Sequence, residues 1–237
     1  MQVKNSRGLI VLGLGLFAGL ALLGYQLSNS HILLKRDERT VTVKGLSERE
    51  MPADVVIWPI SFSQSNNALD EIYQTLDKNK QTVINFLKFR GFNDDEISVS
   101  QVKISDRHTQ GYNENQIKFR YNASQRVVVY SPRIGLARRS MAELPELGKQ
   151  GVATIENYDA YTEFLFTKLN EIKPQMIEES TKNARLSAEI FAADSQSKLG
   201  KIKHARQGQF TIHDRDTNTP HIKKVRVVST IEYYLVD

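Results

Sequence analysis

Hydrophobic and polar positions divide the chain into one long apolar run and a longer region of alternating and helical patterns. The run, residues 8–27, contains no charged residue, and about twenty apolar residues cross a bilayer core of roughly 30 Å as one helix. Lys4 and Arg7 precede the run, whereas the next basic residues after it are Lys35 and Arg36. Because basic residues favour the cytoplasmic side, this pattern predicts a membrane anchor with a cytoplasmic N-terminus and an exported C-terminal region.

The side chains that we expect to face lipid are Leu9, Ile10, Val11, Leu12, Leu14, Leu16, Phe17, Leu20, Leu22 and Leu23. A cleavable signal peptide is the alternative, because it also joins basic residues to an apolar run. Its apolar region is shorter, about 7–15 residues, and ends at a small-residue cleavage site. Only weak cleavage candidates exist, near Gly24 and at residues 28–30. We therefore adopt a retained anchor over residues 1–27 and a tether over residues 28–39.

The remaining residues, 40–237, show the periodicities of strands and helices. Apolar positions three, four and seven residues apart predict helices over residues 68–90, 134–148 and 170–199. Alternation predicts strands over residues 40–46, 53–64, 97–107, 117–130, 152–169, 201–213 and 222–236. Small residues at 180, 184 and 188 would let the third helix lie close to a sheet.

Single residues predict the ends of these helices. Asn66 or Asn67 is expected to cap the first helix, because asparagine is favoured at that position. Gly91 and Gly200 are expected to end the first and third helices. Pro145 should kink or shorten the second helix, because proline lacks the N–H group that a helix interior needs.

The order of elements repeats along the chain, which predicts two βαββ units. One half covers residues 40–130, the other covers residues 152–237, and the helix over 134–148 joins them. We expect an α+β domain with antiparallel sheets and helices packed on one face, preceded by one transmembrane helix. The strand at 40–46 should lie beside the next one, and Pro59 should mark an edge or a bulge, because proline cannot donate to a ladder.

Composition narrows the chemistry further. The chain has no cysteine, which excludes a disulfide framework, a thiol nucleophile and a thiolate metal site. The net charge is +5, but acidic and basic residues are interspersed, which favours a solvated mixed surface over nucleic-acid binding. Trp58 follows the same side of its strand as Val56, Ile60 and Phe62, and we interpret the four as core.

Candidate catalytic and metal-binding groups are few. His204, His213 and His221, with Asp214 and Asp216, have the side chains that bind divalent metals, but a solvated turn is the interpretation that we adopt. The run from Asp214 begins like a calcium loop, yet its sixth and twelfth positions are Thr219 and Val225, where glycine and glutamate are needed.

The sequence also lacks the motifs of common enzymes. No serine lies in a G-x-S-x-G context, and no phosphate-binding glycine pattern lies outside the apolar run. The carboxylates at residues 94–96 are expected to be a solvated turn. We therefore predict no catalytic residue, no cofactor, no metal and no enzymatic activity.

Five segments of the chain form a characteristic series: VTVKGLSEREMPAD, GFNDDEIS, FRYNASQRVVVY, LGKQGVATIENY and ARLSAEIFAADSQSKLGKI. In their order and spacing they resemble the SIMPL domain family, also called DUF541, over about Val41 to Val236. Ala53 departs from the family pattern by separating Pro52 from Asp54. The resemblance implies a bacterial envelope protein without an established catalytic residue, and it implies links to stress responses and to ring-like oligomers.

We therefore expect a protein of the bacterial inner membrane whose periplasmic domain is a structural or interaction module and forms a homo-oligomeric ring. Tyr161, Phe164 and Phe166 are the expected interface, because they lie in a segment with an exposed strand edge, and proteins cover such edges. The same aromatic side chains could instead be core. The alternatives are a binding protein that captures a small or peptidic ligand between the two halves, and a hydrolase or metalloenzyme.

Overall fold

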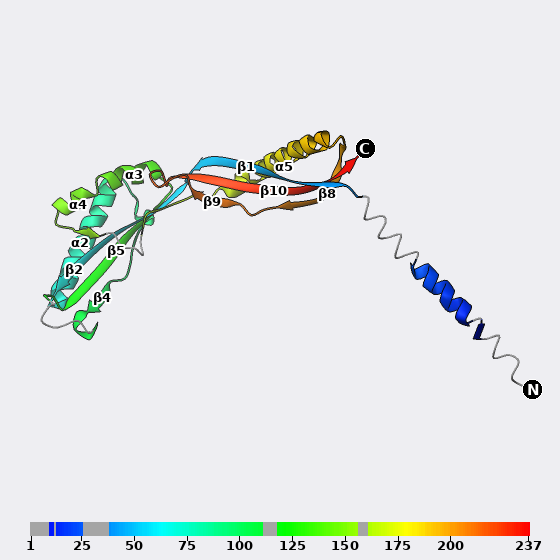
Figure 1. The fold of residues 1–237 in the computed structure, drawn as a ribbon. Helices are drawn as coiled ribbons and strands as arrows, with labels where there is room; N and C mark the ends of the chain where they lie inside the picture. Colours follow the sequence, from blue (N-terminus) through cyan, green and yellow to red (C-terminus); the bar gives the residue numbers. More distant parts are fainter. Residues whose placement is uncertain (1–9, 12, 26–37, 111–117, 156–160) are drawn as a thin grey trace, which may run out of the picture. The chain divides into compact units, whose positions relative to one another are not determined.

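The computed structural model describes residues 10–11, 13–25, 38–110, 118–155 and 161–237 (Figure 1). The chain divides into two compact units. Unit 1 contains Met1–Ser47, Ile177–Gln209 and Val227–Asp237, and unit 2 contains Glu48–Met176 and Phe210–Arg226. The predicted halves, 40–130 and 152–237, are each continuous in sequence, whereas each unit combines separate stretches of the chain. The predicted α+β class with antiparallel sheets is confirmed.

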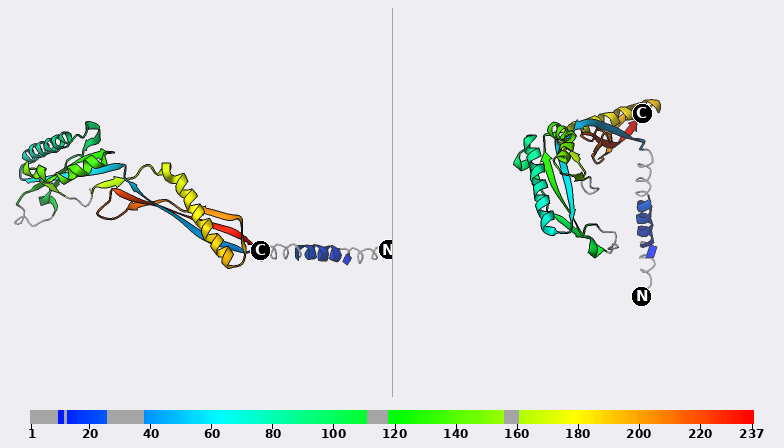
Figure 2. Two further views of the ribbon diagram at one scale, coloured as in Figure 1. Left: turned by 90° about the horizontal axis from the view of Figure 1, so that it is seen from above. Right: turned by 90° about the vertical axis from the view of Figure 1, so that its left-hand side faces the viewer.

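Unit 1 is a sheet covered by one helix. The strand order is β1 (Thr40–Pro52), β10 (Ile222–Val236) and β8 (Lys198–Gln207). β8 pairs antiparallel with β10, from Gln207 opposite Ser229 to Lys198 opposite Val236. Helix α5 (Leu169–Asp194) runs along one face of these strands (Figure 2). The buried side chains between helix and sheet are Val43, Ala184, Ala188, Ile231 and Tyr233.

Small residues set the distance between α5 and the sheet. Ser180, Ala184 and Ala188 are fully buried at four-residue spacing, which places them on one side of the helix. A Cβ atom at Gly45 would lie 1.8 Å from the Ser180 carbonyl oxygen and 2.3 Å from the Ala184 nitrogen. Only glycine therefore fits at this point of β1, and the close approach predicted from the small residues of the helix is confirmed.

Unit 2 contains a sheet of six strands in the order β3-β5-β2-β6, with β4 beside β5 and β7 beside β2. β2 and β5 pair antiparallel from Val56 opposite Ser131 to Asn66 opposite Tyr121. Two 3-10 helices, η1 (Asp94–Glu96) and η2 (Arg107–Gln110), flank the short strands. The strands are β2 (Val55–Asn66), β3 (Ile97–Val99), β4 (Lys103–Asp106), β5 (Tyr121–Ser131), β6 (Thr154–Ile155) and β7 (Glu163–Leu165).

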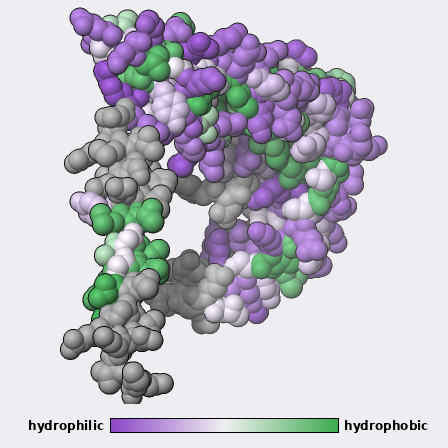
Figure 3. Space-filling model, turned by 90° about the vertical axis from the view of Figure 1, so that its right-hand side faces the viewer, coloured by the Kyte–Doolittle hydropathy of each residue, from purple (hydrophilic) through white to green (hydrophobic). Residues whose placement is uncertain are grey.

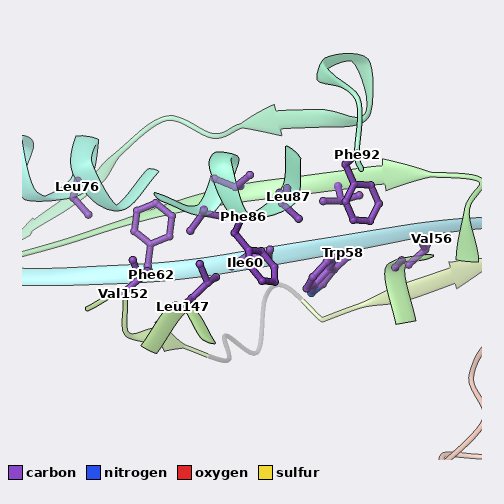
Figure 4. Close-up of a cluster of buried hydrophobic side chains, with 14 of the residues drawn as sticks. Val56, Trp58, Ile60, Phe62, Leu76, Phe86, Leu87, Phe92, Leu147 and Val152 are labelled. Atoms are coloured by element: carbon purple, nitrogen blue, oxygen red, sulfur yellow. The ribbon is translucent and has the colours of Figure 1, made fainter. Parts of the chain in front are cut away.

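Helices α2 (Leu69–Phe89), α3 (Ile134–Ala142) and α4 (Pro145–Lys149) pack on one face of this sheet. Figure 4 shows the core that they enclose: alternate side chains of β2 point toward the inner side of α2 and toward α4. The core role predicted for Trp58 is confirmed, since it is only 3% exposed. The labelled core residues are Val56, Trp58, Ile60, Phe62, Leu76, Phe86, Leu87, Phe92, Leu147 and Val152.

The first strand was predicted wrongly in two respects. It pairs with β10 and not with β2, and it continues through SEREMP to Pro52, beyond the predicted end at residue 46. The charged residues of this stretch, Glu48, Arg49 and Glu50, are consecutive and alternate in sign. Glu48 forms an ion pair with Lys224 at 3.3 Å, and Glu50 forms one with Arg215 at 3.4 Å. Lys224 lies on β10, the strand that pairs with β1, and Arg215 follows β9. A charge pair between neighbouring strands, such as Glu48 with Lys224, stabilises a strand.

The predicted repeat is altered by an exchange of strands. β6 and β7 come from the stretch predicted to open the second half, yet both pair with β2. β1, predicted for the first half, lies instead beside β10. Each sheet therefore contains a strand that the order of elements assigned to the other. Local periodicity carries no information about such partners.

Pro59 lies where the ladder beside β2 is interrupted. β7 pairs with residues 55–57 of β2, and β6 pairs with residues 61–62. On the other side Pro59 lies opposite Val128 of β5. β2 as a whole is therefore an inner strand. Within the described residues, however, neither β6 nor β7 pairs at Pro59. This gap suits proline, which has no N–H group to donate to a neighbouring strand.

Helix ends agree with the predictions in part. Gly91 has a positive φ of 99° and follows α2 as expected, and Pro145 separates α3 from α4. The cap was predicted wrongly: Ala68 is the N-cap of α2, and the Asn66 side chain accepts the Asn67 N–H instead.

Gly200 does not end α5. The helix stops at Asp194, and the chain turns at Gln196, which has a φ of 54°. Gly200 lies inside β8, where a Cβ would lie 2.9 Å from the Tyr234 carbonyl oxygen. The glycine therefore permits close strand contact and not helix termination.

A helix includes described residues 10–11 and 13–25. In the part of the chain that the structure describes, no helix is both long and apolar enough to cross a membrane. The predicted span also includes residues 8, 9, 12, 26 and 27, so Leu9 and Leu12 lie outside the described residues. The anchor stays a prediction.

Candidate functional site

The β9–β10 hairpin contains most of the residues that the sequence singled out for metal binding. β9 (Thr211–Asp214) pairs with β10 from Asp214 opposite Lys223. In the turn, the Asp216 carboxylate accepts hydrogen bonds from the Thr219 hydroxyl, from Arg215, and from the Asn218 and Thr219 N–H groups. The Thr219 and Arg215 bonds are the main reason that the pKa of Asp216 falls to about 2. Asp216 therefore organises the turn as a carboxylate.

The three histidines are separated by these elements. His204 lies on β8 in unit 1, whereas His213 and His221 belong to unit 2. The Asp214 carboxylate, the nearest acidic group in sequence to His213, forms an ion pair with Lys223. Among the described residues, no group of three or more histidine, aspartate or glutamate side chains has the arrangement of a metal site. The hairpin thus uses its carboxylates for ion pairs and turn hydrogen bonds.

His221 lies against the core of unit 2. Its ring meets the Phe164 ring edge-on at 6.0 Å, and its carbonyl oxygen accepts the Ala53 N–H at 2.9 Å. Burial lowers the pKa of His221, and the charges of Arg138 and Arg215 lower it further. Because the imidazolium form is disfavoured, this side chain contributes as a neutral ring.

Glu96 forms a buried polar cluster that the sequence did not predict. Its carboxylate accepts hydrogen bonds from the Ser131 hydroxyl at 2.5 Å, from Arg133 Nε at 3.0 Å and from the Asn93 N–H at 2.8 Å. Burial alone would raise the pKa of Glu96, but the bonds from Arg133 and Ser131 outweigh burial and lower it. We expected residues 94–96 to be a solvated turn, which is wrong for Glu96, only 8% exposed.

The difference between Glu96 and its neighbours has a local cause. Glu96 is the third residue of η1, and its side chain reaches back to the N-cap residue Asn93 in a capping box. That geometry turns the carboxylate inward, toward Ser131 and Arg133. The spacing of Asn93 and Glu96 was visible in the sequence and was the signal for this contact. Asp94, by contrast, is exposed and pairs with Lys88.

Asp54 has a second structural role. Its carboxylate accepts the Thr167 N–H at 2.9 Å, the Lys168 N–H at 3.1 Å and the Thr167 hydroxyl at 3.1 Å. These donors directly precede α5, so Asp54 satisfies N–H groups at the start of a helix more than a hundred residues away in sequence. Nothing in local sequence spacing predicts this partner.

A comparison with protein-family models identifies the family of the chain. The model described as SIMPL, protein of unknown function (DUF541), matches residues 41–227. The chain belongs to the SIMPL family. This match confirms the family resemblance on which the sequence interpretation rested. A comparison with curated proteins finds no match.

The SIMPL domain places the three predicted interface residues in different surroundings. Phe164 of β7 is only 7% exposed and belongs to the core of unit 2, the alternative that the sequence left open. Phe166 is half-buried, and Tyr161 is 69% exposed. Tyr161 is therefore the most exposed of the three.

Unit 1 of the SIMPL domain has a buried polar pair of its own. The hydroxyls of Ser180 on α5 and Ser229 on β10 lie 2.6 Å apart, and both residues are buried. Ser47 is also buried and donates to Glu179 at 2.9 Å. These serines satisfy one another or the helix, so they hold α5 against the sheet.

Proposed function

We propose that this SIMPL protein is anchored in the bacterial inner membrane by residues 8–27 and presents a periplasmic, non-enzymatic domain that serves as a structural or interaction module. The observation that carries the proposal is the exposure of large apolar side chains on the helix that includes described residues 10–11 and 13–25. Ile10 is 60% exposed, Val11 70% and Phe17 73%. Figure 3 shows hydrophobic (green) surface on the part of this helix that is not grey.

Water is an unfavourable environment for such a helix. Each Å² of apolar surface removed from water contributes about 25 cal/mol, so a row of exposed leucines favours transfer into lipid. Lys4 and Arg7 lie before the run, and basic residues of this kind stay on the cytoplasmic side. The domain then lies on the opposite side of the membrane.

The charged groups of the domain support a non-catalytic role. Glu96 is held by Arg133 and Ser131, Asp54 caps α5, and Asp216 organises a turn. A general acid or base must instead reach a substrate with its proton-transferring atom. In each of these three groups the carboxylate oxygens are already used in internal hydrogen bonds.

We also propose that the protein forms a homo-oligomeric ring. β1 and β8 are the two outer strands of the sheet order β1-β10-β8, and unpaired strand edges are surfaces that proteins cover. Pairing of one subunit's edge with the other edge of its neighbour closes a ring when the rotation closes. Tyr161, exposed beside β7, offers a second contact in unit 2.

The membrane part of the proposal is tested with the full chain in isolated membranes. Resistance to alkaline carbonate extraction and an intact mass that includes residues 1–27 are the expected results. Release of the protein by carbonate, or a mature N-terminus after Gly24 or Ser30, would contradict the anchor. Protease added to sealed inner-membrane vesicles of known orientation then reports the side on which the domain lies.

The oligomer is tested by light scattering of the full chain in mild detergent, where we expect a mass of several subunits. Tyr161→Glu should reduce that mass if Tyr161 lies at the interface. The matched control is Tyr73→Glu, an exposed tyrosine on α2, which should leave the mass unchanged. A monomer at micromolar concentration would refute the ring.

A further inference from the structure

The C-terminal half of α5 has two apolar sides. Its inner side consists of Ser180, Ala184, Ala188 and Ala192, which are buried against the sheet. Leu186 and Ile190 each lie two residues beyond one of these alanines, and two residues turn a helix by about 200°. They therefore face away from the sheet and are 58% and 70% exposed, and the neighbouring Phe191 is 58% exposed. A surface helix normally has polar residues at such positions. We call Leu186, Ile190 and Phe191 the outer stripe.

The outer stripe lies at the end of unit 1 where the chain enters from the N-terminal segment. The Arg39 carbonyl oxygen accepts the Leu235 N–H at 2.8 Å, so β1 begins beside the end of β10. Lys198, the first residue of β8, lies opposite Val236, and only three residues separate it from the end of α5. Figure 2 shows the end of α5 beside these strand ends. Ile190 lies four residues from that end, or about 6 Å along the helix axis.

The length of the tether limits how far this end can lie from the bilayer. Eleven residue steps separate Leu27 from Glu38 (38 − 27 = 11), and a fully extended chain spans about 3.3–3.6 Å per residue. The end of unit 1 with the outer stripe therefore stays within about 40 Å of the membrane surface and can reach it.

The size of the stripe favours lipid over a second protein. A stable protein interface has about 800 Å² and 20–30 residues on each side, far more than three side chains provide. A tethered surface needs less, because the tether keeps its effective concentration at the membrane high. Partial insertion of a few large apolar side chains is how interfacial helices bind bilayers.

The charges of the helix indicate what kind of lipid contact is expected. Between residues 177 and 194, α5 has four acidic residues and two basic ones. Lys182 pairs with Glu178, and Arg185 pairs with Glu189. Attraction to anionic headgroups therefore does not drive the binding of this helix to a bilayer, and the contact should also form on zwitterionic lipid.

We propose that Leu186, Ile190 and Phe191 dock on the surface of the bilayer that holds the N-terminal segment, so that the end of α5 lies in the headgroup region. This inference rests on the proposed anchoring. The docked helix would give the domain a second contact with the membrane, in addition to the anchor. The other surfaces of the domain would remain available to partners.

The test uses the full chain in phosphatidylcholine vesicles. Because the chain has no cysteine, Ala193→Cys accepts a single environment-sensitive fluorophore beside the stripe and leaves its three side chains intact. Tyr73→Cys, at an exposed position on α2, is the matched control. We expect nitroxide-labelled lipid to quench the probe at residue 193 at least twofold more than the probe at residue 73, and aqueous iodide to quench it less. The double substitution Leu186→Gln and Ile190→Gln should abolish the difference.

Each outcome separates the two proposals. A chain that fails to float with the vesicles overturns the anchoring and the docking together. A chain that floats, with the probe at residue 193 as open to iodide as the control, overturns the docking alone. A probe shielded from iodide but not quenched by nitroxide lipid also overturns it, because a second copy or another protein segment then covers the stripe.

Discussion

The two units of this protein pack by opposite means. Unit 2 buries large side chains such as Phe62, Ile72 and Leu87, which fill the space between sheet and helices. Unit 1 buries Val43, Ile231 and Tyr233 from its sheet, but its helix contributes alanines and a serine, so that the backbone of α5 lies almost against Gly45 of the sheet. A large-residue core fails when volume is removed, whereas a core at backbone distance fails when volume is added. Added volume should therefore be the most damaging change in unit 1, and lost volume the most damaging change in unit 2.

The largest effect is expected from adding volume in unit 1. Gly45→Ala would place a Cβ atom 1.8 Å from the Ser180 carbonyl oxygen, and backbone atoms cannot move aside as a flexible side chain can. Overpacking usually lowers the free energy of unfolding by about 1–3 kcal/mol. We expect a larger loss here, because α5 would detach from the sheet. Far-UV circular dichroism in a urea titration measures the loss.

Gly148→Ala is the matched control for Gly45→Ala. No heavy atom lies within 4 Å of the Cβ position at Gly148, and alanine favours the helix in which it lies by up to about 1 kcal/mol. Equal stability of the two variants would show that unit 1 is not packed at backbone distance.

Removal of volume in unit 2 comes next. Phe62 is fully buried among the side chains of α2 and α4, and Phe62→Ala should destabilise unit 2 by about 3–5 kcal/mol. Fluorescence of Trp58, the only tryptophan and part of the same core, reports the unfolding of this unit. The control Tyr73→Ala, on the exposed side of α2, should change the midpoint of the unfolding transition little. A small effect of Phe62→Ala would contradict the contrast between the units.

The core of unit 2 could be predicted from the sequence far better than the core of unit 1. Alternation in β2 and helical spacing in α2 identified Val56, Trp58, Ile60, Phe62, Leu76 and Leu87 because large apolar side chains produce a strong periodic signal. In unit 1, Ser180, Ala184 and Ala188 were recognised as small residues, but the contact that Gly45 makes with the helix was not predicted. A glycine that accommodates another backbone looks the same in sequence as one that makes a turn.

Contacts between residues far apart in the sequence were the other feature that could not be predicted. Asp54 and Thr167, or Glu96 and Arg133, lie far apart along the chain, and no spacing rule joins them. The pairing of β1 with β10 was missed for the same reason. Charge alternation in SEREMP was the available signal for strand structure, because Glu48 and Glu50 lie two positions apart and so share one face.

Charge removal at Glu96 is expected to have an intermediate effect. It sharpens the comparison, because the buried hydrogen bond between Ser180 and Ser229 in unit 1 joins two neutral hydroxyls. Glu96→Gln keeps the shape but leaves Arg133 and Ser131 with a weaker acceptor. We expect a loss of about 2 kcal/mol, below the range for a fully buried pair, because the Arg133 side chain is 39% exposed. Thermal unfolding followed by Trp58 fluorescence measures it.

Glu178→Gln is the control for Glu96→Gln. This residue pairs with Lys182 on the exposed surface of α5. Solvent screens such a pair, so the loss of stability should be well below that of Glu96→Gln. The lowered pKa of Glu96 also sets a direction with pH: its contribution is fully present above the ordinary value of 4.5 and is lost as pH falls through the lower folded-state value. A Glu96→Gln variant that unfolds with the same acid sensitivity as the parent would contradict this role.

The smallest effect is expected at Asp216, in the exposed turn of unit 2. Its pKa is about 2 instead of 3.8, chiefly because the Thr219 hydroxyl and Arg215 donate to its carboxylate. Since the folded-state pKa is the lower one, the stabilisation is present above about pH 4 and disappears as the pH falls toward 2. Thr219→Val removes the strongest donor and should raise the pKa of Asp216 toward 3.8, as measured by carboxyl chemical shifts in a pH titration. Thr211→Val, on the neighbouring strand β9, should leave the titration unchanged. An Asp216 pKa near 3.8 in the parent protein would show that this turn is held by its backbone and not by the carboxylate.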